Sequence, residues 1–127
     1  MEHAALIILL ALIQYIIFTL RVGANRAKYH VDAPKTEGNE TWERLFRVQQ
    51  NTLEQLIIFI PAMWFFSLYL SELWALVPGL MFIVGRQLYA HEYVGDPRSR
   101  VPGMALTLLA NAVLMIGAVA GVLIKIF

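Results

Sequence analysis

The chain has 127 residues, of which 59% are hydrophobic and only 15% charged, and its mean hydropathy is +0.63. These values lie outside the usual range of soluble globular domains, so a lipid bilayer is the expected solvent. The formal net charge of +1 and the lack of a dense basic run exclude a nucleic-acid-binding surface. Because the chain contains no cysteine, any thiol chemistry must use a sulfur brought in by a ligand.

Four apolar segments, each long enough to cross a bilayer, follow one another along the chain. The first lacks the basic leader and the small-residue cleavage site of a signal peptide, so we expect it to be a retained helix. The second has a polar first half, for which Asn39 or Thr41 is the expected N-cap. In the fourth, Gly117 and Gly121 form a small-xxx-small step that favours close helix contact. The four expected helices are residues 4–22, 42–70, 73–93 and 104–127.

The sequence therefore predicts an all-α protein, with residues 1–127 forming one integral membrane four-helix bundle. Basic residues set its expected orientation, because they concentrate on the cytoplasmic side of a membrane protein. The opposite side of the predicted bundle has only Lys125. The basic residues that flank the first and third loops are Arg21, Arg26, Lys28, Lys35, Arg98 and Arg100. We expect loops 23–41 and 94–103 to face the cytoplasm and both termini to lie on the other side.

Two predicted helices carry matching polar faces. Arg47, Asn51 and Glu54 fall on one stripe of the second helix, at i, i+4 and i+7. The third helix has a similar stripe near the same end, formed by Arg86, Tyr89 and Tyr93. Ionisable groups at membrane depth cost several kcal/mol unless they are paired or hydrated, so both stripes should point into the bundle or a wet cavity.

Any one of these residues has an ordinary explanation. Arg47 and Glu43 could be a simple i, i+4 ion pair, and the tyrosines could belong to the interfacial aromatic belt. The cluster as a whole favours a functional site, because guanidinium groups bind carboxylates and a carboxylate binds an ammonium group. Glutathione has that charge pattern. No metal site is expected, because the three histidines, His3, His30 and His91, lack ligand spacing.

Two continuous motifs stand on the second and third predicted helices. The first is the run WERLFRVQQN at residues 42–51, followed by Glu54 and Pro61. The second is GRQLYA at residues 85–90, followed by Tyr93, Gly95-Asp96-Pro97 and Arg100. Both motifs resemble those of the membrane-associated proteins in eicosanoid and glutathione metabolism (MAPEG). The second motif is similar to that of the microsomal glutathione transferases and the cysteinyl-leukotriene synthases.

The resemblance implies a homotrimer of four-helix subunits that binds glutathione as co-substrate in a cytoplasm-facing pocket between subunits. A lipophilic electrophile would enter from the membrane lipid. Arg100 would be the catalytic arginine that stabilises the glutathione thiolate. The residues that would hold glutathione are Arg47, Asn51, Glu54, Tyr89 and Tyr93, joined from a neighbouring subunit by Arg26 and Gln49. Arg86 also matches the motif, and we expect it to have a structural role before a role in glutathione binding.

The sequence thus predicts a membrane-bound glutathione S-transferase of the microsomal type, with glutathione-dependent lipid peroxidase activity as a further expectation. Gln55 stands where the leukotriene synthases have a tyrosine, which favours a broader transferase or peroxidase. A non-catalytic lipid-binding scaffold of the same family is the alternative, although Arg100 argues against it. A small multidrug exporter is a third class, but it needs an acidic residue inside the first helix, and residues 4–22 contain none.

Overall fold

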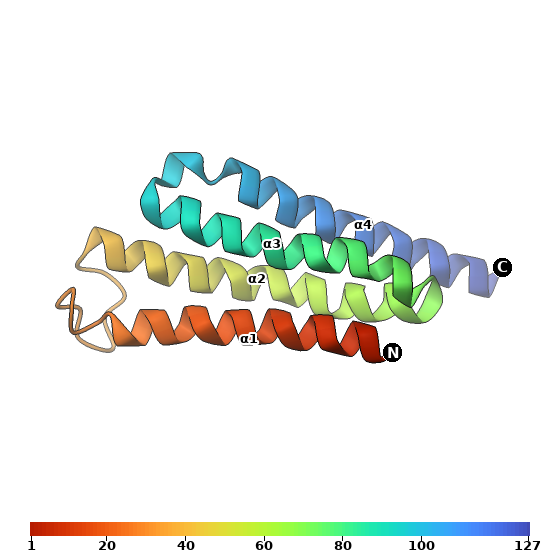
Figure 1. The fold of residues 1–127 in the computed structure, drawn as a ribbon, viewed down its shortest axis with the longest axis horizontal. Helices are drawn as coiled ribbons and strands as arrows, with labels where there is room; N and C mark the ends of the chain where they lie inside the picture. The colour runs from red at the N-terminus through yellow and green to blue at the C-terminus, as the bar shows by residue number, and fades with distance from the viewer.

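The computed structural model describes all 127 residues as four long helices connected by short segments. In chain order these are α1 (Glu2–Ala24), α2 (Glu40–Tyr69), α3 (Glu72–Gly95), the short 3-10 helix η1 (Pro97–Ser99) and α4 (Val101–Ile126). The helices run up and down, so the α1–α2 and α3–α4 connections lie at one end and both termini at the other (Figure 1). This places the two predicted loops at the same end of the bundle.

The helix boundaries follow from local capping. The side chain of Asn39 accepts a hydrogen bond from the backbone N of Trp42 at 2.9 Å, and Ser71 caps α3 through the backbone N of Trp74 at 3.2 Å. The fourth helix begins at Val101 rather than at residue 104, because Pro102 occupies its first turn, where no backbone N–H is required. The remaining ends differ from the expected ones by one or two residues.

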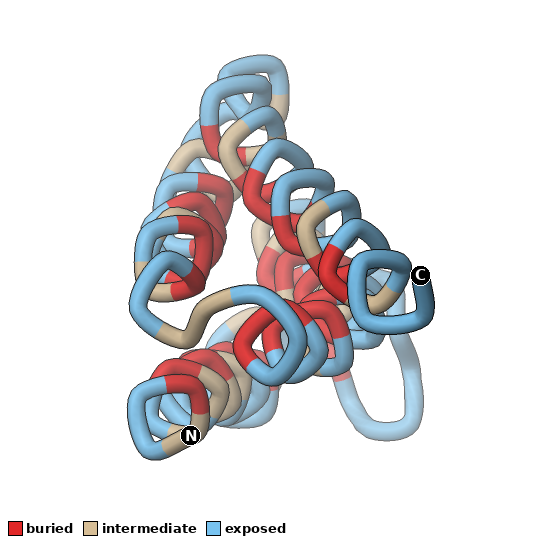
Figure 2. Tube along the Cα trace, turned by 90° about the vertical axis from the view of Figure 1, so that its right-hand side faces the viewer, coloured by how far each residue is buried: buried red, intermediate tan, exposed pale blue.

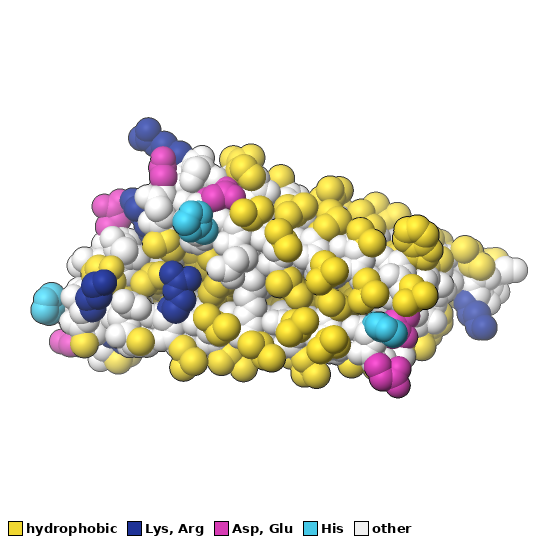
Figure 3. Space-filling view, in the orientation of Figure 1, with side chains coloured by type: hydrophobic (Ala, Val, Ile, Leu, Met, Phe, Trp, Pro, Cys, Tyr) yellow, Lys and Arg dark blue, Asp and Glu magenta, His cyan; other side chains and the backbone are white.

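The core lies along the middle of the bundle and is formed by one face of each helix. Buried positions turn toward the neighbouring helices, while the outward positions are exposed (Figure 2). Phe59 of α2 and Phe82 of α3 stack at the centre with ring centroids 3.9 Å apart. On the face that Figure 3 shows, the middle of the bundle is largely hydrophobic, whereas charged side chains gather toward the two ends.

This distribution is that of a bundle surrounded by lipid. All four helices are long and apolar enough to cross a membrane. Many large apolar side chains are exposed along them, including Ile57, Trp74 and Ile116 at 69%, 72% and 69%. In water such a surface would drive aggregation, but in a bilayer it contacts acyl chains. The expected all-helical membrane fold is confirmed.

Glycines on α4 allow this helix to approach its neighbours closely. A Cβ atom on Gly117 would lie 2.2 Å from the Phe66 ring, and one on Gly121 would lie 2.8 Å from the carbonyl oxygen of Tyr69. These contacts confirm the predicted small-xxx-small step, which packs on α2. Near the other end, a Cβ atom on Gly103 would lie 2.4 Å from the backbone N of Tyr89. The α3–α4 spacing at this level therefore depends on Gly103.

Gly103→Ala should lower the thermal stability of the protein, because the added methyl group meets the α3 backbone rather than a movable side chain. Overpacking of this kind costs about 1 to 3 kcal/mol. Gly23→Ala is the matched control, since no atom lies within 4 Å of its added Cβ. Circular dichroism melting in detergent measures both variants. Equal melting temperatures would show that the two helices do not need this close approach.

Candidate functional site

A buried arginine joins three helices at the polar end of the bundle. Arg86 on α3 is 0% exposed, and its Nη2 donates a hydrogen bond of 2.7 Å to Oδ1 of Asn51 on α2. Its Nη1 lies 3.5 Å from the hydroxyl of Thr107 on α4. No carboxylate forms a salt bridge with this guanidinium within the protomer. The Arg86–Asn51 bond shows that the polar faces of α2 and α3 meet at one level of the bundle.

The guanidinium of Arg86 also lies over an aromatic ring of the same helix. Its central carbon is 4.5 Å from the ring centroid of Tyr89, which favours the positive charge electrostatically. Tyr89 in turn stacks on Tyr93, with centroids 5.4 Å apart and an interplanar angle of 16°. Arg86 and the two tyrosines therefore form one continuous stack along α3.

The polar stripe of α2 divides into an inner and an outer part. Asn51 points inward to Arg86 and is only 7% exposed. The side chains of Arg47 and Glu54 remain 51% and 56% exposed, and their charged atoms lie 3.5 Å apart. The alternative pairing of Arg47 with Glu43 is not formed, because the Glu43 carboxylate accepts a hydrogen bond from the backbone N of Gly38 instead.

The outer pair is unusual because of its depth. Glu54 lies midway along the membrane-spanning helix α2, and Arg47 lies two turns closer to the loop end. Charged groups at such a position are costly when they face lipid, so a wet cavity or a second protein surface must cover them. Next to Arg47 the protomer has a depression of about 440 Å³, which Tyr93 also lines.

Three of the predicted site residues lie away from this cluster. The Arg26 guanidinium lies 4.6 Å from the centroid of the Trp42 ring and donates to the carbonyl oxygen of Lys35 at 2.8 Å. Gln49 faces α1, where its Nε2 lies 3.3 Å from the hydroxyl of Thr19. Arg100 is exposed at the start of α4 and donates to the carbonyl oxygen of Pro97 at 2.9 Å.

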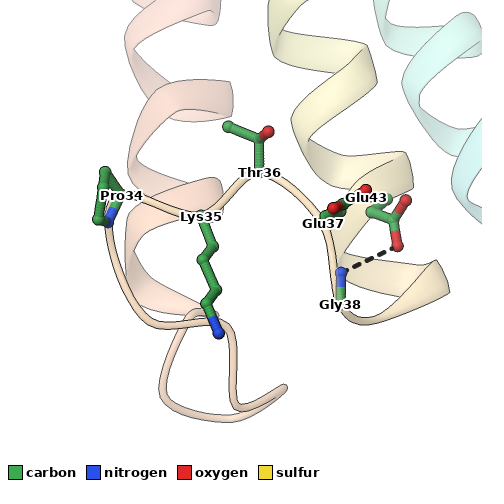
Figure 4. A pocket seen from close by; sticks show the side chains of 6 residues that line it. All are labelled: Pro34, Lys35, Thr36, Glu37, Gly38 and Glu43. Atoms are coloured by element: carbon green, nitrogen blue, oxygen red, sulfur yellow. Dashed lines mark hydrogen bonds between the residues drawn. The ribbon is translucent and has the colours of Figure 1, made fainter.

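The protomer alone thus assembles only part of the predicted set. The residues that it brings together on α2 and α3 are Arg47, Asn51, Glu54, Tyr89 and Tyr93, with Arg86 behind them. The α1–α2 loop also borders an open pocket of about 700 Å³, lined by residues 34–38 and Glu43 (Figure 4). No predicted site residue lines this pocket, although Thr36 and Glu43 border both it and the depression beside Arg47.

Two residues of α4 contribute polar contacts to the interior. Asn111 donates from Nδ2 to Oε1 of Gln55 on the neighbouring helix α2 at 3.1 Å. Thr107, which the sequence did not single out, contacts Arg86. A signal was present in the spacing, because Thr107 and Asn111 stand at i and i+4 on a helix whose only other polar side chain is the terminal Lys125.

Comparison with known proteins decides the family. The model of the MAPEG family matches residues 4–120, which is nearly the whole chain. The chain belongs to the MAPEG family. Human microsomal glutathione S-transferase 2 is 36% identical over 118 residues, which cover 93% of this chain and 80% of the human protein. Rat leukotriene C4 synthase is 28% identical over 120 residues, or 94% of this chain and 80% of the rat protein.

A further relative of this MAPEG protein has no named activity. An uncharacterized protein of Synechocystis sp. is 43% identical over 119 residues, which cover 94% of this chain and 87% of the relative. The relatives with named activities include microsomal glutathione S-transferases and leukotriene C4 synthases. These comparisons support an enzyme of the glutathione transferase type.

Proposed function

We propose that this MAPEG protein is a membrane-bound glutathione transferase that conjugates the glutathione thiolate to lipophilic electrophiles, and that it also reduces lipid hydroperoxides with glutathione. The observation that carries this proposal is the polar cluster on α2 and α3, where the half-exposed Arg47–Glu54 pair lies beside the buried Arg86–Asn51 bond. The named relatives support the same reaction class.

The charges of the cluster complement those of glutathione. This tripeptide carries two carboxylates and one ammonium group at neutral pH. An arginine fork binds a carboxylate through two parallel hydrogen bonds, so Arg47 is suited to a carboxylate of the ligand. The Glu54 carboxylate is suited to the ammonium group. When glutathione binds, each member of the Arg47–Glu54 pair would exchange its neighbour for an oppositely charged group of the ligand.

The site is proposed to be completed by other copies of the chain, in a homotrimer. The exposed Arg47–Glu54 pair requires a covering surface at membrane depth. A symmetric copy of the chain would supply such a surface, because its own α2 carries the same polar face. In this arrangement Arg26 and Gln49 would reach the glutathione site of the neighbouring subunit. The loop end of the bundle, with its basic residues, would face the cytoplasm, where glutathione is available.

Arg100 is proposed to activate the thiol. A guanidinium group keeps its proton at any ordinary pH, so it acts as a fixed positive charge with several donors. Placed beside the sulfur, it would favour the thiolate, which is the nucleophilic form. The thiolate sulfur then attacks the electrophilic carbon of the co-substrate, and the leaving group departs with the bonding electrons. The flanking Pro97 and Pro102 restrict the backbone on both sides of Arg100.

A non-catalytic lipid-binding scaffold is the second candidate, because Arg100 lies apart from the cluster in the protomer. Two measurements distinguish the candidates. Calorimetric titration of the purified protein with glutathione and with ophthalmic acid, its thiol-free analogue, tests the binding site. Turnover of a chromogenic aryl halide tests the chemistry. Binding without turnover of any electrophile or hydroperoxide would favour the scaffold.

The oligomeric state gives a first prediction. Native mass spectrometry of the protein released from detergent should show a trimer, because three copies can cover one another's α2 polar faces around an axis. A monomer that still binds glutathione would contradict a site shared between subunits.

Substitutions in the exposed pair give a second prediction. Glu54→Gln and Arg47→Ala should each weaken glutathione binding by roughly tenfold or more, since each removes a charge-assisted contact worth about 1.5 to 3 kcal/mol. Arg98→Ala is the control, because it removes an exposed charge of the 3-10 helix η1 outside the cluster. Unchanged affinity with a lowered melting temperature would assign the pair a purely structural role.

A third prediction concerns the thiolate. Arg100→Ala should leave glutathione binding largely intact but suppress the ultraviolet absorbance of the bound thiolate and lower turnover by roughly a hundredfold or more. Arg100→Lys should restore only part of the rate, because a point charge replaces the planar fork. Stopped-flow absorbance across pH measures the thiolate, with Arg98→Ala again as control. An alanine variant with the wild-type pH midpoint and normal turnover would exclude Arg100 as the activating residue.

A further inference from the structure

We propose that a wedge-shaped groove between α3 and α4, at the end of the bundle that carries the two termini, holds one acyl chain of a membrane phospholipid. The groove has a volume of about 510 Å³. It lies at the opposite end of the bundle from the proposed glutathione site. The bound lipid is therefore a structural partner and not a substrate, and the inference goes beyond the proposed function.

The groove exists because α3 and α4 diverge. At the loop end their backbones approach closely, since a Cβ atom on Gly85 would lie 3.0 Å from the backbone N of Thr107. In its other half α4 packs on α2 instead, where a Cβ atom on Gly117 would lie 2.2 Å from the ring of Phe66. Figure 2 views the bundle from the terminal end, where α3 and α4 lie apart, and the two helices converge toward the far end.

Three helices line the groove with mostly apolar side chains. The lining residues are Phe66 and Leu70 of α2, Val77 and Pro78 of α3, and Val113 of α4, with Ser71 and Trp74 at the terminal end. No charged residue is among them. Such a lining gives water and ions almost no polar partners, so the occupant that it favours is a hydrocarbon chain.

The edges of the groove face the interior of the membrane. Trp74 and Val77 on α3 are 72% and 55% exposed, and Ile116 on α4 is 69% exposed. Both helices are long and apolar enough to cross a bilayer, so acyl chains surround these side chains. A chain that enters the groove contacts three helices at once, whereas a chain on the outer surface contacts only one side of the protein. The added dispersion contacts favour a lipid that stays bound.

A second copy of the chain is the other occupant to consider, and the geometry of α2 argues against it. The face of α2 that we propose to meet neighbouring subunits carries Arg47 and Glu54. At 3.6 residues per turn, Phe66 points roughly 120° away from Glu54 around the helix axis. A copy that covers the polar face therefore leaves the groove open to lipid.

The terminal end of the groove is suited to the head-group region of a phospholipid. The indole N–H of Trp74 has no hydrogen-bond partner in the chain, and the Ser71 hydroxyl accepts from the backbone N of Trp74, which leaves its own hydrogen free to donate. Ester and phosphate oxygens accept such hydrogen bonds, and tryptophan is common at this level of a membrane protein. The neighbouring Glu72 carboxylate is turned toward α1, where Nδ1 of His3 lies 2.8 Å from it.

Fluorescence quenching tests the site, because Trp74 lines it. In a Trp64→Phe background Trp74 is the one exposed tryptophan, since Trp42 is 0% exposed. The detergent-solubilised protein is titrated with a phosphatidylcholine that carries bromine atoms on its acyl chains, and bromine quenches tryptophan fluorescence on contact. Quenching should saturate near one lipid per protomer, and the melting temperature should rise with lipid concentration.

Val113→Phe fills the groove from α4, so it should weaken the saturable quenching by roughly tenfold or more and remove the lipid-dependent rise in melting temperature. The matched control is Val84→Phe, the same substitution at a position of α3 that is 51% exposed but lies outside the groove, and it should behave like its parent. Should Val113→Phe fail to fold, Val77→Phe fills the groove from α3.

Two outcomes would overturn the lipid site. One is quenching that rises linearly with lipid and is unchanged in a folded Val113→Phe or Val77→Phe variant, which is the result for loosely surrounding lipid. The other is the absence of quenching in the Trp64→Phe parent, which is the result for a groove covered by a second copy. Neither outcome affects the proposed function, because glutathione binding is measured separately and its proposed site lies at the other end of the bundle.

Discussion

The arrangement of the bundle at its polar end depends on the placement of one positive charge inside it. Arg86 is fully buried, and it is held by an amide on α2, a hydroxyl on α4 and an aromatic ring on its own helix. A buried ion without such partners would be very costly, because the interior of a bundle in lipid offers no water to replace them. The three helices must therefore keep the relative positions that supply these contacts, and Gly103 permits the close α3–α4 approach at this level.

The layers around Arg86 differ in the partners that they still need. The inner layer, Asn51 and Tyr89, is held in place within the chain but keeps free donors. The outer layer, Arg47 and Glu54, is charged, half-exposed and midway along a membrane helix. The first layer is suited to a ligand and the second to a ligand together with a covering subunit. The proposed glutathione site between copies of the chain would satisfy both needs.

Hydrogen bonds between neutral polar side chains also restrict the relative positions of the helices elsewhere in the bundle, more weakly than the buried charge does. Gln14 of α1 donates to the carbonyl oxygen of Ile83 on α3 at 3.0 Å, and Asn111 of α4 donates to Gln55 of α2. Because lipid provides no competing hydrogen bonds, such pairs help to define which faces of the helices meet. Gln55 is thereby engaged in the packing of α2 against α4.

The sequence by itself determined the features that depend on local chemistry. Long apolar runs indicated four membrane helices, Asn39 and Thr41 were the two candidates for the N-cap of α2, of which Asn39 caps it, and the spacing of Arg47, Asn51 and Glu54 placed them on one side of α2. The resemblance of two motifs also identified the family, because these motifs are continuous in the chain.

Only the tertiary structure decided which polar residue turns inward. Asn51 and Arg47 are one turn apart on the same face of α2, so helical periodicity cannot tell which of them is buried. Their burial depends on which residues of α3 pack against each of them. The burial of Arg86 and its contact with Thr107 likewise arise from helix packing, since these residues are 21 positions apart in the sequence.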